Sequence, residues 1–149
     1  MAGEGAKQPD NVMVGTSGWS YEEWIGPFYK APESKFTVYS RVFNTVEINS
    51  TFYRYPDTGL ISGLARSSPP GFVSSAKLPQ TLTHEKALEP GAALENDLNR
   101  FLALMEPLLR AGKLGPLLAQ LPPSFRYSSF DRLERFLALL PQAYRFAVE

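Results

Sequence analysis

Short blocks of hydrophobic and polar residues alternate along the chain and predict a repeating order of strand and helix. Five segments have the two-residue alternation or the short apolar run of a strand: residues 12–14, 45–50, 72–78, 117–121 and 145–149. Four segments between them space their apolar residues as one face of a helix does: 36–43, 57–67, 94–109 and 128–140. This order predicts an α/β protein with about five parallel strands and four helices, joined by right-handed crossovers.

The longest predicted helix, residues 94–109, contains a proline near its end. Pro107 has no amide hydrogen to donate, so we expect it to kink the helix or to end its regular hydrogen bonding. Gly112 is a suitable stop a few residues later.

The alternation along each strand also predicts which side chains share a face. In residues 45–50, Val46 and Ile48 share one face, and Glu47 and Asn49 share the other. Helices cover the outer face of a parallel barrel, so the apolar pair should face the helices and the polar pair should point inward. The same alternation predicts this inward set on the later strands: Val73, Ser75, Lys77, Leu118, Gln120, Ala147 and Glu149.

Polar side chains from several strands are thus predicted at one end of one interior, where barrel enzymes build their active sites. An unpaired buried charge costs several kcal/mol, so Glu47, Lys77 and Glu149 should interact with one another or face a wet cavity. We favour a functional site; the alternative is a structural polar layer that plugs the mouth of the barrel.

A series of motifs resembles the YecE-like family, a family of unknown function also called domain of unknown function family 72. In order, the motifs are Gly15-Thr16-Ser17-Gly18-Trp19, Trp24, Phe28-Tyr29, residues 46–53, Lys77, Thr83-His84, residues 120–123 and Ala147-Val148-Glu149. Several motifs in the right order make the resemblance specific. It implies a TIM-type (β/α)₈ barrel, grouped near xylose isomerase and endonuclease-IV-like barrels, and it implies no known reaction.

Members of that family continue well past the motif that here includes Glu149. An intact barrel needs about 250 residues, whereas this chain has 149. We therefore expect a disordered tail over residues 1–11 and the N-terminal half of a barrel over residues 12–149. A fragment, a split gene product and an artificial truncation are the alternatives. The expected partner is the remaining half of the barrel or a second copy of the chain.

Four residues are candidates for catalysis. Glu47 suits a general base or a metal ligand, or else forms a salt bridge with Lys77 or Arg54. Glu149 could supply a second carboxylate for metal or acid/base chemistry. Lys77 could bind a phosphate or carboxylate, or form a Schiff base. His84, the only histidine, is a candidate acid, base or metal ligand, or a surface loop residue.

Further residues are candidates for binding a ligand. The loop that contains Thr16 and Ser17 could hold an anion with its backbone amides, and Trp19 could stack on a sugar or base; tight packing of the loop is the alternative. Tyr53 could reach the site through its hydroxyl. Two amide side chains, Asn49 and Gln120, could orient a polar ligand or satisfy buried neighbours.

Composition narrows the function further. The formal net charge is zero, which does not support a dedicated nucleic-acid binder, and the absence of cysteine excludes thiolate chemistry and disulfides. No apolar run approaches the roughly 20 residues of a membrane span, and residues 1–10 lack an apolar export segment, so we expect a cytoplasmic protein.

The predicted function is that of an enzyme or binding protein for a small polar ligand, such as a sugar, phosphate or nucleotide. Metal-assisted hydrolysis or isomerisation would suit Glu47, Glu149 and His84, with a divalent metal as the cofactor. The alternatives are a metal-dependent nuclease or DNA-processing protein, by analogy of fold alone, and a non-catalytic interaction module.

Overall fold

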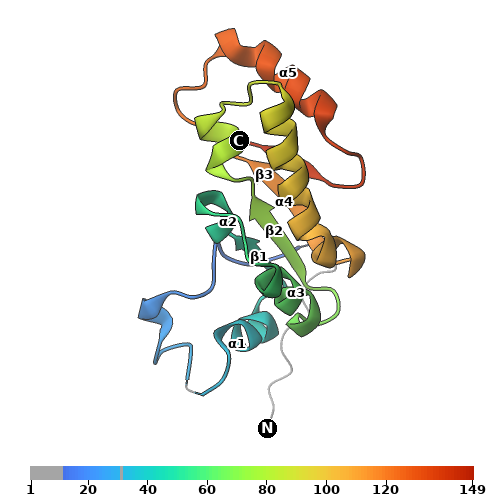
Figure 1. Cartoon of the computed structure of the whole chain (residues 1–149). Helices are drawn as coiled ribbons and strands as arrows, with labels where there is room; N and C mark the ends of the chain where they lie inside the picture. The colour runs from blue at the N-terminus through green and yellow to red at the C-terminus, as the bar shows by residue number, and fades with distance from the viewer. Residues whose placement is uncertain (1–11, 31) are drawn as a thin grey trace.

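The computed structural model describes residues 12–30 and 32–149, which form a parallel four-stranded sheet with helices packed on it (Figure 1). The strands are β1 (Thr45–Ile48), β2 (Val73–Lys77), β3 (Leu114–Ala119) and β4 (Phe146–Val148). They pair in chain order, β1-β2-β3-β4, and all three pairings are parallel. The predicted α/β class with parallel strands is confirmed. The predicted tail over residues 1–11 lies outside the described residues.

Helices occupy the connections between the strands. The four predicted helices correspond to α1 (Lys35–Val42), α3 (Thr58–Ser67), α4 (Ala92–Arg110) and α5 (Phe130–Leu139). Shorter helical segments are η1 (Glu22–Trp24), α2 (Ser50–Tyr53), the π-helical turn η2 (Thr81–Glu85) and η3 (Tyr127–Ser129). No helix in the described part of the chain has both the length and the apolar character to cross a membrane.

The prediction of a strand at residues 12–14 is wrong. Only a single bridge, between Ser17 and Glu47, joins this part of the chain to β1. The Glu47 amide donates to the Thr16 carbonyl at 3.0 Å, and the Gly18 amide donates to the Glu47 carbonyl at 2.9 Å. The Val14 amide donates instead to the side-chain oxygen of Asn44 at 2.7 Å. That side-chain bond takes up the donor that a longer strand ladder would use, and the sheet therefore has four strands rather than five.

Several boundaries also differ from the prediction. Strand β1 ends at Ile48, so Asn49 and Ser50 lie in the turn into α2 rather than in the predicted strand. Helix α4 continues through Pro107 to Arg110, because buried Leu108 holds its last turn in the core. Strand β3 begins at Leu114 rather than at residue 117. Its register with β2 shifts between Ser74 and Ala76, and such an irregularity accommodates Pro116, which cannot donate to a regular ladder.

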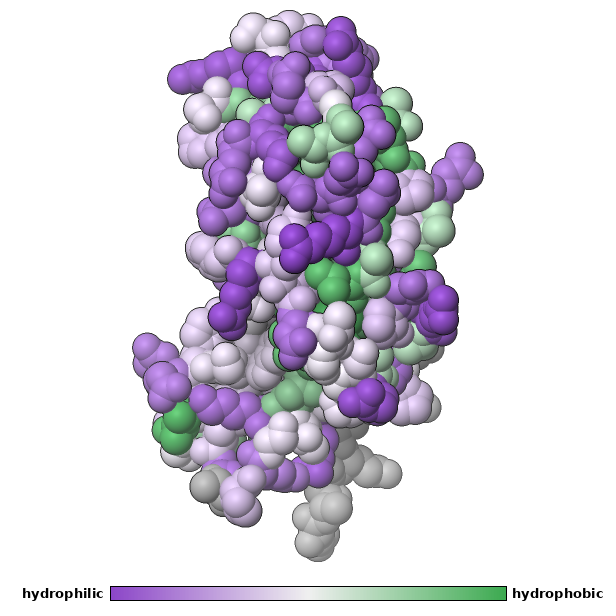
Figure 2. Space-filling view, viewed as in Figure 1, coloured by the Kyte–Doolittle hydropathy of each residue, from purple (hydrophilic) through white to green (hydrophobic). Residues whose placement is uncertain are grey.

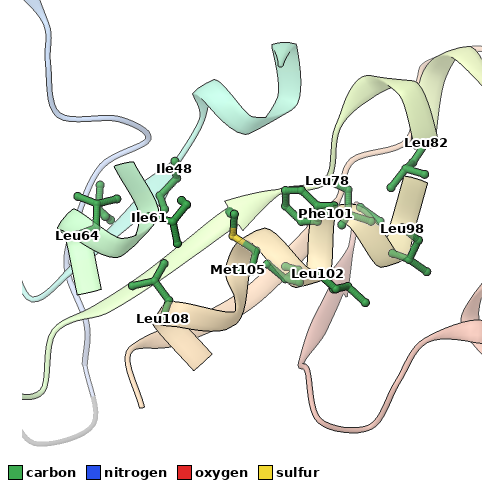
Figure 3. Close-up of a cluster of buried hydrophobic side chains, with 14 of the residues drawn as sticks. Ile48, Ile61, Leu64, Leu78, Leu82, Leu98, Phe101, Leu102, Met105 and Leu108 are labelled. Atoms are coloured by element: carbon green, nitrogen blue, oxygen red, sulfur yellow. The ribbon is translucent and has the colours of Figure 1, made fainter. Parts of the chain in front are cut away.

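The core lies on the helix-facing side of the sheet. Val46 and Ile48 are buried there, while Glu47 between them is half-buried, so the predicted face alternation of β1 is confirmed. Side chains of α3 and α4, among them Ile61 and Met105, pack in the same cluster (Figure 3). The other face of the sheet is more open: Pro116 of β3 is exposed.

Candidate functional site

The structure brings three predicted site residues together at the carboxyl end of β1. Oε1 of Glu47 accepts a hydrogen bond from the Ser17 hydroxyl at 2.8 Å and lies 3.7 Å from Nζ of Lys77. The two charged side chains remain partly open, with 25% of the Glu47 side chain and 18% of the Lys77 side chain exposed. The pairing arises because parallel β1 and β2 both present their inward faces at this end. A ligand could therefore reach an acceptor and a donor side by side.

Thr16 has a role within the loop itself. Its amide donates to the Tyr39 hydroxyl oxygen at 2.8 Å, and its hydroxyl donates to the Gly18 carbonyl at 2.6 Å. Because both donors are already bonded within the protein, Thr16 fixes the loop beside β1 rather than presenting its amide to an anion.

A hollow of about 450 Å³ opens where β1 ends and α2 begins; Glu47 and Lys77 are not among the residues that line it. It contains three of the predicted ligand-binding residues, Trp19, Asn49 and Tyr53. The complete lining is Gly18, Trp19, Ser20, Tyr21, Asn49, Ser50, Tyr53, Arg54 and Leu60. The chain turns into α2 immediately after β1, and this turn places residues 49–54 around the opening.

Trp19 is held in place by two contacts. Its ring meets Phe36 edge-on, with centroids 5.3 Å apart, and its carbonyl accepts a hydrogen bond from the Tyr29 hydroxyl. Burial, with a smaller contribution from Tyr39, raises the pKa of Tyr29 to about 12. Tyr29 therefore remains a hydroxyl donor over the physiological range, and it fixes the backbone that carries the indole.

His84 lies in η2, outside the lining of this hollow. Its Nδ1 is 2.8 Å from the Thr83 hydroxyl, and its ring meets Phe52 edge-on at a centroid distance of 5.0 Å. Phe52 in turn contacts Tyr53, with centroids 5.1 Å apart. The histidine is thus linked to the hollow through the aromatic rings of α2.

Glu149 follows β4, at the opposite edge of the sheet from β1, and Gln120 follows the neighbouring strand β3. The Leu121 amide donates to the Glu149 carbonyl at 2.7 Å, which places the end of β4 beside the segment after β3. Strands β2 and β3 lie between β1 and β4. Neighbouring strands are about 4.8 Å apart, so the strands that lead to Glu47 and Glu149 are roughly 14 Å apart along the sheet. They do not form a close pair.

The three predicted metal ligands, Glu47, Glu149 and His84, are therefore not gathered at one point. Within residues 12–30 and 32–149, no group of three or more histidine, cysteine, aspartate or glutamate side chains is arranged to hold a metal ion.

Arg54, Ser50 and Leu60 are lining residues that the sequence did not predict as part of the site. The sequence suggests Lys77 or Arg54 as a salt-bridge partner of Glu47, and in the structure the partner is Lys77. The available signal for Arg54 was its position, directly after the residue 46–53 motif that also contains Glu47 and Asn49.

The fold and the site together define a parallel α/β protein with polar side chains gathered at the carboxyl ends of its strands. The sequence pattern of the family described as "Protein of unknown function DUF72" matches residues 13–149, and the chain belongs to that family.

Two curated relatives of the chain are described as UPF0759 proteins. It is 28% identical over 138 residues to the UPF0759 protein YecE of Escherichia coli K12, covering 93% of this chain and 47% of that protein. It is 28% identical over 115 residues to the UPF0759 protein YunF of Bacillus subtilis, covering 76% of this chain and 41% of YunF. The chain therefore spans about half the length of these curated relatives.

Solved structures agree on the fold. A DUF72 family protein from Thermotoga maritima superimposes with a TM-score of 0.75 at 32% identity, over 92% of this chain and 54% of that one. A DUF72 family protein from Enterococcus faecalis superimposes with a TM-score of 0.68 at 16% identity, over 91% of this chain and 50% of that one. The second likeness concerns the fold alone.

Proposed function

We propose that this chain is part of a (β/α)₈ barrel and that it carries a binding site for a small polar ligand at the carboxyl ends of its strands. The sheet supports the barrel assignment, since its four parallel strands follow chain order with helices between them, as the wall of such a barrel requires. The length of the relatives, about twice the matched segment, is consistent with further strands in the whole protein.

The observation that carries the binding proposal is the partly exposed Glu47–Lys77 pair at the carboxyl ends of β1 and β2, close in the chain to Asn49, which lines the hollow. Asn49 follows β1 directly, at the start of the turn into α2, and it lines the hollow. A ligand that extends from the hollow to the pair could donate a hydroxyl to Glu47 and accept from Lys77, while Asn49 orients a second polar group. Trp19, an aromatic ring at the wall of the hollow, suits the apolar face of a sugar.

In an enzyme, Glu47 would be the general base and Lys77 the electrostatic partner for charge that develops on the substrate. Hydrolysis or isomerisation of a sugar-like substrate is the corresponding reaction class. A divalent metal would need ligands from outside the described residues, because Glu47 has neither Glu149 nor His84 in a three-residue cluster with it. The nuclease alternative gains no support, since the net charge is zero and no such cluster is present in the described part of the chain.

Isothermal titration calorimetry of the full chain against neutral aldoses, with D-ribose and D-xylose as probes, tests the binding proposal. Glu47→Gln keeps the shape of the side chain and removes its charge, and we expect it to weaken binding by about tenfold or more, equivalent to about 1.4 kcal/mol. Trp19→Leu should also weaken binding. Glu134→Gln, an exposed position on α5 far along the chain, is the matched control and should leave affinity unchanged. Binding that is insensitive to Glu47→Gln would contradict the proposal.

A further inference from the structure

A second hollow, of about 490 Å³, adjoins the first on the side of α3 and α4. The two share Ser50, Arg54 and Leu60 in their linings. The complete lining of the second hollow is Ser50, Arg54, Tyr55, Pro56, Asp57, Leu60, Arg100 and Leu104. The first hollow is lined mainly by uncharged side chains, whereas the second brings two arginines to one opening.

Arg100 extends from the middle of α4 over an aromatic ring. Its guanidinium carbon lies 4.4 Å from the centroid of the Tyr55 ring. Tyr55 is itself held by half-burial and by a long hydrogen bond of 3.5 Å from its hydroxyl to the Asp97 carbonyl. A guanidinium held over a ring by cation–π attraction can still donate hydrogen bonds from its N–H groups to a ligand.

Arg54 follows α2 directly, and its amide caps that helix by donating to the Ser50 carbonyl at 3.3 Å. Its side chain is exposed. Neither Arg54 nor Arg100 forms an ion pair with a residue that the structure describes, although seven other cationic side chains of the same part do. Strongly hydrophilic surface covers the middle of α4 and the region beside α2 (Figure 2).

One acidic residue, Asp57, also lines the second hollow. Its carboxylate lies close to the first turn of α3, since Oδ2 would be 3.0 Å from a Cβ atom added at Gly59. This carboxylate forms no ion pair with Arg54 or Arg100. The amides of that turn partly offset its negative charge. The hollow therefore has a net positive charge, with two guanidinium groups against one carboxylate.

We propose that Arg54 and Arg100 bind the phosphate group of a phosphorylated ligand whose uncharged, sugar-like part occupies the first hollow. This inference rests on the proposed function and deepens it, because it specifies a phosphomonoester of a small sugar as the ligand class. Guanidinium groups bind phosphate oxygens through paired, charge-assisted hydrogen bonds, and the Ser50 hydroxyl, in both linings, can donate at the junction.

The test compares D-ribose 5-phosphate, D-ribose and inorganic phosphate in calorimetric titrations of the full chain at constant ionic strength. We expect the phosphorylated sugar to bind about tenfold or more tightly than the free sugar. Arg54→Gln and Arg100→Gln should each remove about fivefold or more of this gain. Arg100→Gln should leave the affinity for D-ribose unchanged, because Arg100 does not line the first hollow. Arg100→Lys keeps the charge but not the paired donors. Its affinity for D-ribose 5-phosphate should therefore lie between those of the native chain and Arg100→Gln. Arg66→Gln, an exposed arginine on α3 outside both hollows, is the matched control.

The outcomes separate this inference from the proposal on which it rests. The arginine site would be overturned if D-ribose 5-phosphate bound no more tightly than D-ribose. It would also be overturned if both glutamine variants kept this difference in affinity, or if Arg66→Gln reduced it equally. If only Lys77→Gln removed the tighter binding of the phosphorylated sugar, the phosphate would lie at the strand ends, and the arginine site would again be overturned. Free sugar binding that depends on Glu47 would in each case still support the proposed function. Arginine-dependent binding of inorganic phosphate without Glu47-dependent sugar binding would support the anion site and contradict the proposed function.

Discussion

The side-chain oxygen of Thr51 lies 2.8 Å from the backbone carbonyl oxygen of Lys77. The same oxygen is 2.8 Å from the carbonyl of Ile48, and the Thr51 side chain is fully buried. One hydroxyl group thus ties the first turn of α2 to the carboxyl ends of both β1 and β2. The position of the hollow relative to the Glu47–Lys77 pair depends on this connection.

Replacement of Thr51 by valine should destabilise the fold. Valine keeps the shape of threonine but removes the single hydroxyl proton that the Ile48 and Lys77 carbonyl groups share, which should cost about 1–3 kcal/mol. Thr51→Ser keeps the hydroxyl and is the control; it should lose only the contribution of the methyl group, about 1 kcal/mol. Urea denaturation of the three chains measures the difference, and a Thr51→Val chain as stable as the native one would show that the hydroxyl does not hold α2.

Gly15 lies where the loop before η1 passes against β1. A Cβ atom there would be 2.0 Å from the Thr45 carbonyl oxygen, which is a collision with backbone. We expect Gly15→Ala to displace the loop that carries Ser17 and Trp19, to cost more than about 1 kcal/mol, and to weaken ligand binding. Gly63→Ala is the control, because a Cβ there meets nothing within 4 Å. Inside α3 it should stabilise the chain by roughly 0.5–1 kcal/mol.

The Glu47–Lys77 pair should contribute little to folding. Both side chains are partly exposed and their charged atoms are 3.7 Å apart, so removal of either charge should cost less than about 1 kcal/mol. Melting curves of Glu47→Gln, Lys77→Gln and the double variant measure this coupling. A loss of about 3–5 kcal/mol with unchanged ligand binding would indicate a structural pair instead.

The chain should lose stability in alkaline solution partly through Tyr29. Burial raises the pKa of Tyr29 from its ordinary value of 10.0 to about 12, so the folded state holds the phenolic proton more tightly than the unfolded state. Its contribution is complete below about pH 10 and is lost as the pH rises toward 12. Between about pH 10 and pH 12, the free energy of unfolding should fall less steeply for Tyr29→Phe than for the native chain. Denaturation at several pH values measures this difference. An unchanged slope would assign the decline to other groups.

The outer edge of β4 should promote self-association. Val148 on this strand is 42% exposed, and β3 is the only described neighbour of β4, so its other side offers a strand edge to a second chain. We expect light scattering after size-exclusion chromatography to show a mass that rises with concentration, and Val148→Lys to reduce it. Val42→Lys, at a 58% exposed position on α1, is the control. A monodisperse monomer at micromolar concentration that melts cooperatively would contradict this prediction.

Local pattern in the sequence determined much of the fold. The apolar spacing of residues 94–109 and 128–140 predicted α4 and α5, and the alternation around Glu47 predicted which face of β1 is buried. These features depend on side chains that are close along the chain, where the period of a helix or strand is visible directly. The strand predicted at residues 12–14 failed because pairing also requires a partner, and Asn44 takes up the Val14 amide instead.

Only the tertiary structure decided which distant residues meet. The register of β1 against β2 sets Glu47 beside Lys77, while the order of the strands keeps Glu149 at the far edge of the sheet. The packing of α4 brings Arg100 to the hollow that Arg54 borders. The alternation of residues along a strand predicts the face on which a side chain lies, but it does not predict the neighbour of that side chain across the sheet. That neighbour depends on strand register and helix packing, which the whole core determines together.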